Sequence, residues 1–403
     1  MSQSRFTRRS LLQGSAALAG VMTANRLTGS HGFLGTAHAQ VIPEQSTVVC
    51  LYLLGGYNAL FCSADSFVPA NSFACTSSNV MDLGNGLVVD ASFGALPSFA
   101  QQHMATIGIN HHLSGHDTAN NANFTDGAGN CYPVMLASAM GGTSAIKCVT
   151  VGQDDLPSNS INPYGAVSMQ KVTDMASTIA ALGGAASDPT VPNRVIAASG
   201  LTAVQAMTQQ RLLASPRSLQ SLGNAYSTGI STLMQPAQVF SYPTLAQAYG
   251  MSPTSTGVVD FQSKMAAAEL MVLAGANVVN IIETQDGWDT HGDSDGSQVR
   301  QQMTQDILPP LATFLSRMLN TPGYNVVLAI FGEFSRSLPG SDHAPNLSST
   351  VMGKYVQVGT TGRVSSDVTL SSTPAIPQFW SFLAAAAHCP TAPFGANPHP
   401  LVM

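Results

Sequence analysis

A strand–helix–strand pattern over residues 277–331 limits, more than any other feature, how this chain can fold. The segments 277–283 (Asn-Val-Val-Asn-Ile-Ile-Glu) and 325–331 (Asn-Val-Val-Leu-Ala-Ile-Phe) are short and largely apolar, which is typical of strands that are covered on both faces. Residues 297–319 between them have the length and composition of a helix, in which Pro309-Pro310 predicts a kink or a break. The pattern therefore predicts a βαβ unit in a parallel sheet, with a right-handed crossover.

Further segments extend this prediction to a three-layer α/β fold with a mostly parallel sheet flanked by helices. The apolar run 47–54, closed by Gly55-Gly56, predicts a central strand, and 103–109 and 355–358 predict two more. Residues 261–276 predict a helix because they are rich in Ala, Met, Leu and Glu. The middle region, about 128–260, carries weaker signals, with helical periodicity around 167–183, 202–225 and 244–250. Since open parallel sheets bind ligands beyond the carboxyl ends of their strands, the loops after 47–54, 277–283 and 325–331 are expected to hold the site.

The N-terminal residues 1–39 have the layout of a twin-arginine signal peptide. Arg8 and Arg9 precede a mildly apolar stretch, 11–24, and Ala37-His38-Ala39 offers the small residues that a signal peptidase reads. The apolar stretch is too short for a membrane-spanning helix. We therefore expect cleavage after Ala39, leaving residues 40–403 as a single α/β domain.

Charged residues make up only 9% of the chain, with a net charge of -6, and 44% of the residues are hydrophobic. The hydrophobic content excludes a disordered chain, and 15 basic against 21 acidic residues make nucleic acid a poor partner. Residues 1–39 hold four arginines and no acid, so their removal takes the net charge from -6 to -10. The 6 cysteines permit up to three disulfides in an oxidising compartment, although Cys50 fits a buried free thiol equally well.

The loop after 277–283 contains the first candidate metal ligands. Asp289 and His291 lie two residues apart, so in an extended loop both side chains leave on the same side. A carboxylate and an imidazole that converge suit a divalent metal ion. For Asp293 and Asp295 the better interpretation is an ordinary solvated turn.

The loop after 325–331 contains a second set. Glu333 directly follows a buried strand, where a carboxylate needs a partner or a metal. Arg336 could be that partner, or it could hold a tetrahedral oxyanion, because a guanidinium matches phosphate or sulfate bidentately. Asp342 and His343 form a second adjacent acid–imidazole pair, and two such pairs after neighbouring strands favour a metal site.

A third set lies in the polar loop expected over residues 110–126. His116 is the metal-ligand candidate there, whereas His111 and His112 are better explained as side chains that cap backbone groups. Ser114 could act as a nucleophile if a metal or a base activates it. No Gly-x-Ser-x-Gly elbow occurs, so a serine hydrolase triad of that type has no support.

The order of these motifs resembles the bacterial family known as domain of unknown function 1501, whose members are exported by the twin-arginine route and are related in fold to alkaline phosphatases and sulfatases. The resemblance spans nearly the whole of residues 40–403. Its most specific motifs are the family's Phe-Asp-Thr-His, Glu-Phe-Gly-Arg and Asp-His-Gly, each altered here by one residue: Trp288-Asp289-Thr290-His291, Glu333-Phe334-Ser335-Arg336 and Asp342-His343-Ala344.

The resemblance implies an alkaline phosphatase-like fold in which aspartates and histidines from these loops hold metal around a phosphate or sulfate. Asn58 stands where the family has an acid after the first strand, so it is an expected but uncharged ligand. His116 is similar to the histidine of the family's Ser-His segment. The metal ligands implied in this way are Asp289, His291, Asp342, His343, His116 and Asn58.

From these observations we expect an exported, metal-assisted hydrolase of phosphate or sulfate esters. Arg336, Glu333 and Ser114 are its candidate catalytic residues, and zinc, magnesium, manganese or calcium is its candidate metal. The expected partners are a small-molecule or glycan ester and the twin-arginine export machinery, and the expected location is the periplasm or the outside of the cell. The alternative is a non-catalytic exported protein of the same fold that acts in binding or surface assembly.

Overall fold

The computed structural model describes the larger part of the chain downstream of residue 43. The described residues are 44–61, 64, 75–142, 144–183, 200, 202–204, 206, 240–284, 287–336, 341–361 and 375–403. The predicted signal peptide over 1–39 and most of the helix expected over 202–225 lie outside them.

A mixed sheet of eight described strands forms the centre of the fold, in the order β12-β4-β11-β8-β1-β7-β5-β6. Its strands are β1 (Gln45–Leu53), β4 (Met104–Ile109), β5 (Cys148–Val151), β6 (Met169–Val172), β7 (Val278–Glu283), β8 (Tyr324–Gly332), β11 (Leu347–Gly353) and β12 (Gly359–Thr361). β1 pairs in parallel with β7 on one side and with β8 on the other. The predicted fold class, a mostly parallel sheet flanked by helices, is therefore confirmed.

β11 is the strand that runs against the others, since it pairs antiparallel with both β4 and β8. The strand predicted over 355–358 is wrong, because β11 ends at Gly353 and β12 begins at Gly359. Ser and Thr side chains hid β11 from a search for apolar runs. They are buried, and two of them have partners inside the protein: the Ser349 hydroxyl donates to the Ile107 carbonyl at 3.1 Å, and the Thr350 hydroxyl lies 3.0 Å from that of Tyr57.

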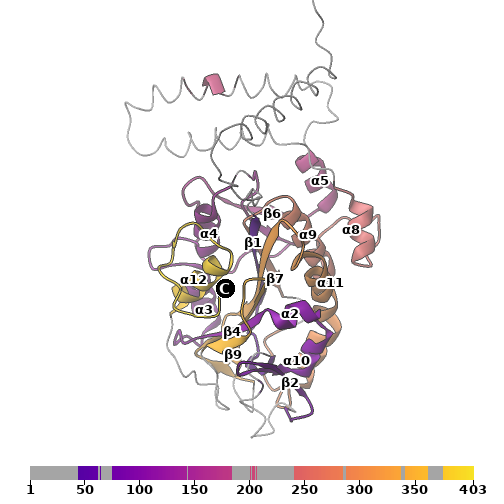
Figure 1. The fold of residues 1–403 in the computed structure, drawn as a ribbon, viewed down its shortest axis with the longest axis vertical. Helices are drawn as coiled ribbons and strands as arrows, with labels where there is room; N and C mark the ends of the chain where they lie inside the picture. The colour runs from indigo at the N-terminus through magenta and orange to yellow at the C-terminus, as the bar shows by residue number, and fades with distance from the viewer. Residues whose placement is uncertain are drawn as a thin grey trace, which may run out of the picture. The chain divides into compact units, whose positions relative to one another are not determined.

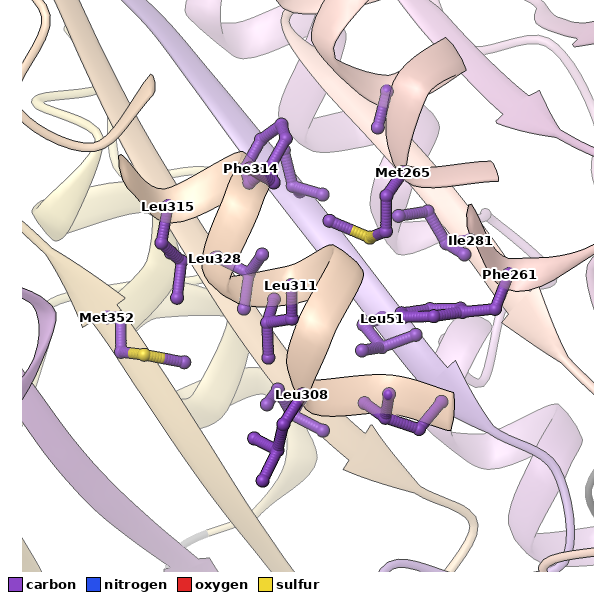
Figure 2. Packing of buried hydrophobic residues seen from close by; sticks show 14 of the residues in the cluster. Leu51, Phe261, Met265, Ile281, Leu308, Leu311, Phe314, Leu315, Leu328 and Met352 are labelled. Carbon is purple, nitrogen blue, oxygen red and sulfur yellow. The ribbon is translucent and has the colours of Figure 1, made fainter. Parts of the chain in front are cut away.

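Helices cover both faces of this sheet (Figure 1). One face packs against α9 (Phe261–Leu273) and α11 (Leu308–Met318), and the other against α3 (His116–Phe124), α4 (Tyr132–Met140) and α12 (Ile376–Ala386). Successive residues of β1 alternate between the two cores: Leu51 lies with α9 and α11, and Tyr52 with α3 and α12. Figure 2 shows the first core, where Leu311 and Phe314 of α11 lie over Leu51 and Leu328 of the sheet.

The prolines predicted to break the helix over 297–319 lie at a change of helix type. The segment consists of α10 (Ser297–Gln302), a π-helical turn over Met303–Ile307, and α11. Proline lacks an N–H donor and clashes with the carbonyl of the preceding turn. The wider π-turn directly before Pro309 and Pro310 gives room for the two rings, so the helix continues through them.

Short elements complete the described chain. They are the hairpin β2 (Val80–Gly84) and β3 (Leu87–Asp90), the two-residue pair β9 (Ser335–Arg336) and β10 (His343–Ala344), the 3-10 turns Ala59–Phe61 and Ala91–Ala95, and the helices α2 (Ser98–Gln102), α5 (Met175–Gly183) and α8 (Tyr242–Ala248). The periodicity at 167–183 thus divides into β6 and α5, and that at 244–250 corresponds to α8. Cys50, Cys131, Cys148 and Cys389 are free thiols. The Cys75 thiol donates to the Ala64 carbonyl at 3.2 Å, and Cys62 lies outside the described residues. Among the described helices, none has both the length and the apolar character needed to cross a membrane.

Candidate metal centre

Four loops converge at the edge of the sheet where β1, β4, β7 and β8 end. His116 is the first residue of α3, which follows β4; Asp289 and His291 lie in the loop after β7; and His343 begins β10, opposite Arg336 of β9. The prediction that these loops share one edge is correct, because the four strands run in the same direction.

Three imidazoles surround the Asp289 carboxylate. His116 Nε2 lies 3.6 Å from Asp289 Oδ2, and His291 Nε2 and His343 Nε2 lie 3.3 and 3.9 Å from Asp289 Oδ1. One nitrogen or oxygen atom from each of His116, Asp289 and His343 lies within 4.8 Å of the others. The Asp289 side chain is 48% exposed, so solvent reaches the centre of this group.

The other ring nitrogen of each imidazole is directed at an oxygen. His116 Nδ1 contacts the Glu333 carboxylate, His343 Nδ1 donates to the Ser114 carbonyl at 2.6 Å, and His291 Nδ1 lies 3.4 Å from Asp342 Oδ1. A carbonyl or carboxylate oxygen can only accept, so the proton of a neutral His116 or His343 ring is placed on Nδ1. The Nε2 lone pair of each of these two rings then faces Asp289.

Arg336 fixes the position of Asp289. Its guanidinium is fully buried and donates to Asp289 Oδ1, to the Gly55 carbonyl and, at 3.0 Å, to the Ser341 carbonyl. Burial raises the pKa of the Asp289 carboxyl, but the hydrogen bond and charge of Arg336 outweigh this, so its pKa lies below the ordinary value. Of the two roles predicted for Arg336, the ion-pair role is present, with Asp289 rather than Glu333 as the partner.

The same positive charge acts on His343. Burial lowers the pKa of this imidazole, the charge of Arg336 adds to the effect, and the hydrogen bond to the Ser114 carbonyl opposes it. The net direction is downward, which keeps the ring neutral and its Nε2 lone pair available for a metal ion at neutral pH.

Glu333 is fully buried behind His116 instead of facing solvent. Its Oε2 accepts from the Gly55 amide at 2.8 Å, and its Oε1 contacts His116 Nδ1. Its main-chain carbonyl accepts from His111 Nε2 and from Asn123 Nδ2, both at 3.0 Å. Glu333 therefore orients a ligand from behind, and the carboxylate predicted as catalytic has no face toward a substrate.

His111 has the capping role predicted for it. Its Nε2 donates to the Glu333 carbonyl, and its Nδ1 accepts from the Leu113 amide at 3.0 Å. Burial lowers its pKa to about 4, so the ring is neutral and joins β8 to the loop that carries Ser114. Asp293 and Asp295 accept from backbone amides at the start of α10; Asp295 is exposed as expected of a solvated turn, whereas Asp293 is buried.

Three predicted site residues have contacts that differ from those expected. Asp342 was expected to bind metal directly, but its carboxylate lies on the Nδ1 side of His291 and is 74% exposed. Asn58 is fully buried, and its amide oxygen accepts from the Leu60 amide at 2.9 Å, which gives it a structural role. Ser114 contributes its main-chain carbonyl to His343 and has an exposed side chain.

Two further residues shape the centre and were not singled out from the sequence. The Phe334 ring packs against the rings of His343 and His116, with centroids 4.2 and 5.0 Å away. Gly55 has a φ of 122°, and a Cβ there would lie 2.3 Å from the Asp289 amide nitrogen. The glycine pair after an apolar strand was the available signal for this close approach.

Thr290 and Ser341 join two of the loops. Their hydroxyls lie 2.8 Å apart, and both side chains are buried. This contact connects the loop of Asp289 and His291 to the segment that carries His343. Arg336 therefore fixes Asp289, Glu333 fixes His116, and the hydroxyl pair fixes the two loops relative to each other, so the site is preorganised.

Comparison with known proteins gives distant likenesses of fold. No protein family and no curated protein matches the chain. A magnesium-bound mutant of the alkaline phosphatase from the Antarctic bacterium TAB5 is similar over 86% of this chain and 99% of its own, with a TM-score of 0.35 and 10% identity. The structure of Ps i-CgsB in complex with a neocarrahexaose is similar over 88% of this chain and 75% of its own, with a TM-score of 0.33 and 7% identity. Because these likenesses are remote, we infer the chemistry of the site from its own geometry.

Proposed function

We propose that the chain is an exported hydrolase of phosphate or sulfate esters that uses a divalent metal ion held by His116, Asp289, His291 and His343. The observation that carries the proposal is the common orientation of the three imidazoles. Each has an oxygen at Nδ1 and its Nε2 directed at Asp289, which is the arrangement that fixes metal-binding histidines in proteins.

Four of the six separations among the ligand groups, with either carboxylate oxygen of Asp289 as the ligand atom, are near those expected around a tetrahedral ion. Ligand atoms about 2.0–2.1 Å from zinc lie about 3.4 Å from one another. The separations that involve Asp289 are 3.3, 3.6 and 3.9 Å, and His291 Nε2 lies 2.9 Å from His343 Nε2. Three nitrogens and one carboxylate favour zinc or another transition metal over magnesium or calcium, which prefer oxygen ligands.

Other residues of the chain would position the metal ligands and supply the nucleophile. Arg336 holds Asp289 ionised and in place, and Glu333 sets the orientation of His116. When bound, the ion would act as a Lewis acid on the ester oxygen and make water more acidic. Ser114 lies next to this centre through its own carbonyl, and we propose its exposed hydroxyl as the nucleophile.

The alternative function, binding or surface assembly without catalysis, is favoured by one observation. Both terminal nitrogens of Arg336 are bound inside the protein, and the side chain is fully buried. The guanidinium predicted to hold an oxyanion is therefore committed to Asp289 and to two backbone carbonyls. On this alternative the metal would organise a surface rather than activate an ester.

Metal analysis of the exported protein tests the proposal. We expect one transition-metal ion per chain, loss of the ion in Asp289→Asn, and retention in Asp295→Asn, a matched change in the same loop that leaves the imidazoles untouched. Ser114→Ala should keep the metal and lose ester hydrolysis. Wild-type protein that takes up no metal on dialysis against zinc, manganese, magnesium or calcium would rule out the hydrolase. Stoichiometric metal without hydrolysis of aryl phosphates or sulfates would favour the alternative.

A further inference from the structure

We infer that this centre acts on singly charged esters, namely sulfate monoesters or phosphate diesters, in preference to doubly charged phosphate monoesters. The inference rests on the proposed hydrolase function and specifies its substrate by charge. It follows from the balance of charges around Asp289 and from the engagement of the basic side chains elsewhere.

The side chains at the centre carry more negative than positive charge. Asp289, Glu333 and Asp342 supply three carboxylates, and Arg336 supplies one guanidinium. The three imidazoles add no charge when they are neutral ligands. A single divalent ion would therefore bring this group to neutrality without leaving a surplus for an anionic substrate. Asp117, the residue after His116 in the first turn of α3, is exposed and carries one further negative charge.

Basic side chains in the described part of the chain are engaged with carboxylates, with Lys147 as the exception. The pairs are Lys171–Asp155, Lys264–Asp154, Lys264–Glu283, Arg300–Asp90, Arg317–Glu269, Arg336–Asp289 and Lys354–Glu44. Lys147 directly precedes β5, at the edge of the sheet opposite the centre. Arg194, Arg211, Arg217 and Arg363 lie outside the described residues. The described side chains thus offer no free guanidinium or ammonium to a phosphate.

The number of charges on the ester decides how well it fits such a site. A phosphate monoester carries close to two negative charges above pH 7, and proteins usually meet the second with an arginine or lysine. Sulfate monoesters and phosphate diesters carry one. At a centre that the metal makes neutral, the second charge loses hydration without gaining a partner, and it is repelled by Asp342, whose Oδ1 lies 3.4 Å from His291 Nδ1.

Three substrates with the same leaving group test this at pH 8. The full-length exported protein, loaded with zinc, would be assayed on p-nitrophenyl sulfate, methyl p-nitrophenyl phosphate and p-nitrophenyl phosphate. We expect kcat/KM on the sulfate or the diester to exceed that on the monoester about fivefold or more, the factor for one uncompensated unit charge about 4 Å away in a water-like dielectric. Comparison of kcat/KM on the sulfate with that on the diester shows which of the two singly charged esters is the better substrate.

A charge variant tests the cause of the preference. Asp117→Asn removes a negative charge beside His116 and should reduce the preference for the singly charged ester about two- to threefold, at a separation of roughly 8 Å in a water-like dielectric. Glu44→Gln is the matched control, because Glu44 precedes β1, about 30 Å from the carboxyl end of that strand. It should leave the preference unchanged.

Two results would overturn the inference while leaving the hydrolase proposal intact: a kcat/KM on the monoester equal to or above the other two, and two bound ions per chain. A preference that Asp117→Asn does not alter would overturn the assignment of that preference to negative charge around the centre. Stoichiometric metal without turnover of any of the three esters would instead remove the hydrolase proposal, and this inference with it.

Discussion

His291 and His343 face each other through their Nε2 atoms, 2.9 Å apart. The Ser114 carbonyl accepts from His343 Nδ1, and Asp342 Oδ1 lies 3.4 Å from His291 Nδ1, so with both ring protons on Nδ1 two lone pairs would meet. Two like lone pairs at this distance repel unless a cation or a proton lies between them. The pair therefore marks the side of Asp289 on which an ion would gain most.

Removal of one of these imidazoles should abolish tight metal binding. For His343→Asn we expect the zinc affinity to fall more than about 100-fold, beyond the 10- to 100-fold typical of residues that only support a ligand. His112→Asn is the matched control, because His112 is an exposed histidine with a φ of 59° that asparagine tolerates. Isothermal titration calorimetry with zinc compares the two, and equal affinities would show that His343 is not a ligand.

Replacement of Glu333 should weaken the metal site without removing it. In Glu333→Gln a single amide oxygen replaces two carboxylate oxygens that now serve the Gly55 amide and His116 Nδ1. We expect a 10- to 100-fold loss of zinc affinity, roughly the range for partners that orient a ligand, and a loss of about 1–3 kcal/mol in unfolding free energy. Urea denaturation of the metal-free protein separates the two effects, and an unchanged zinc affinity would contradict the orienting role.

His111 should make the fold sensitive to acid. Its pKa is about 4 in the folded chain, from an ordinary 6.5, so between these values the unfolded chain binds a proton that the folded chain does not. Stability is therefore complete above pH 6.5 and is lost as the pH falls toward 4, by up to about 3 kcal/mol at about 1.4 kcal/mol per pH unit.

The variant His111→Gln checks this assignment. Glutamine can still donate to the Glu333 carbonyl but does not titrate. We expect the stability of the metal-free variant to fall less steeply than that of the wild type between pH 6.5 and 4, where the low-pKa carboxylates still keep their charge. Parallel slopes for the two proteins, measured by urea denaturation at several pH values, would assign the acid sensitivity to another group.

Replacement of the buried Lys264 should reduce the free energy of unfolding far more than replacement of the exposed Lys171. Its side chain is 1% exposed and donates to Asp154 at 2.9 Å and to the fully buried Glu283 at 3.2 Å. Lys264→Met leaves the Glu283 carboxylate buried without this counter-charge, at a cost of about 3–5 kcal/mol. Lys171→Met, which breaks an exposed pair with Asp155, should cost about 0–1 kcal/mol. Similar losses in the two variants, measured by thermal or chemical denaturation, would contradict this ranking.

Gly55 should tolerate no side chain. In Gly55→Ala the new methyl group would lie 2.3 Å from the Asp289 amide nitrogen, on a backbone with a φ of 122°. We expect lower stability together with weaker zinc binding, because the loop that carries Asp289 and His291 must move. Gly127→Ala is the control, since a Cβ there would meet nothing within 4 Å. If Gly55→Ala bound zinc as tightly as Gly127→Ala, this close contact would not position the metal ligands.

The parts of the fold that sequence reasoning located share one physical property. β1 and β8 are buried on both faces, so nearly every position is apolar and the strands are visible as continuous runs. β11 and α3 were missed because they bury polar groups. Asn123 of α3, for example, is buried and donates to the carbonyls of Gly332 and Glu333. Hydrogen bonds of this kind cannot be predicted from the spacing of apolar residues.

The candidate site was likewise predictable only in part. Strand direction was enough to predict that Asp289, His291 and His343 would share one edge of the sheet. It could not separate residues that face the centre from residues behind it. Glu333 and Asp342 were expected in front, and they lie at the Nδ1 sides of His116 and His291. That distinction depends on side-chain orientation, which spacing along a loop does not determine.

The four proposed ligands come from the start of α3, the loop after β7 and the start of β10, with His116 and His343 at opposite ends of a long stretch of chain. Contacts between residues so distant in sequence require the chain between them to be closed into a loop first, which makes folds rich in such contacts slow to form. A complete set of ligands therefore exists only in the finished fold, and a metal ion bound there would stabilise the native chain and not its precursors. Metal content would then serve as a readout of how much of a preparation has reached the native state.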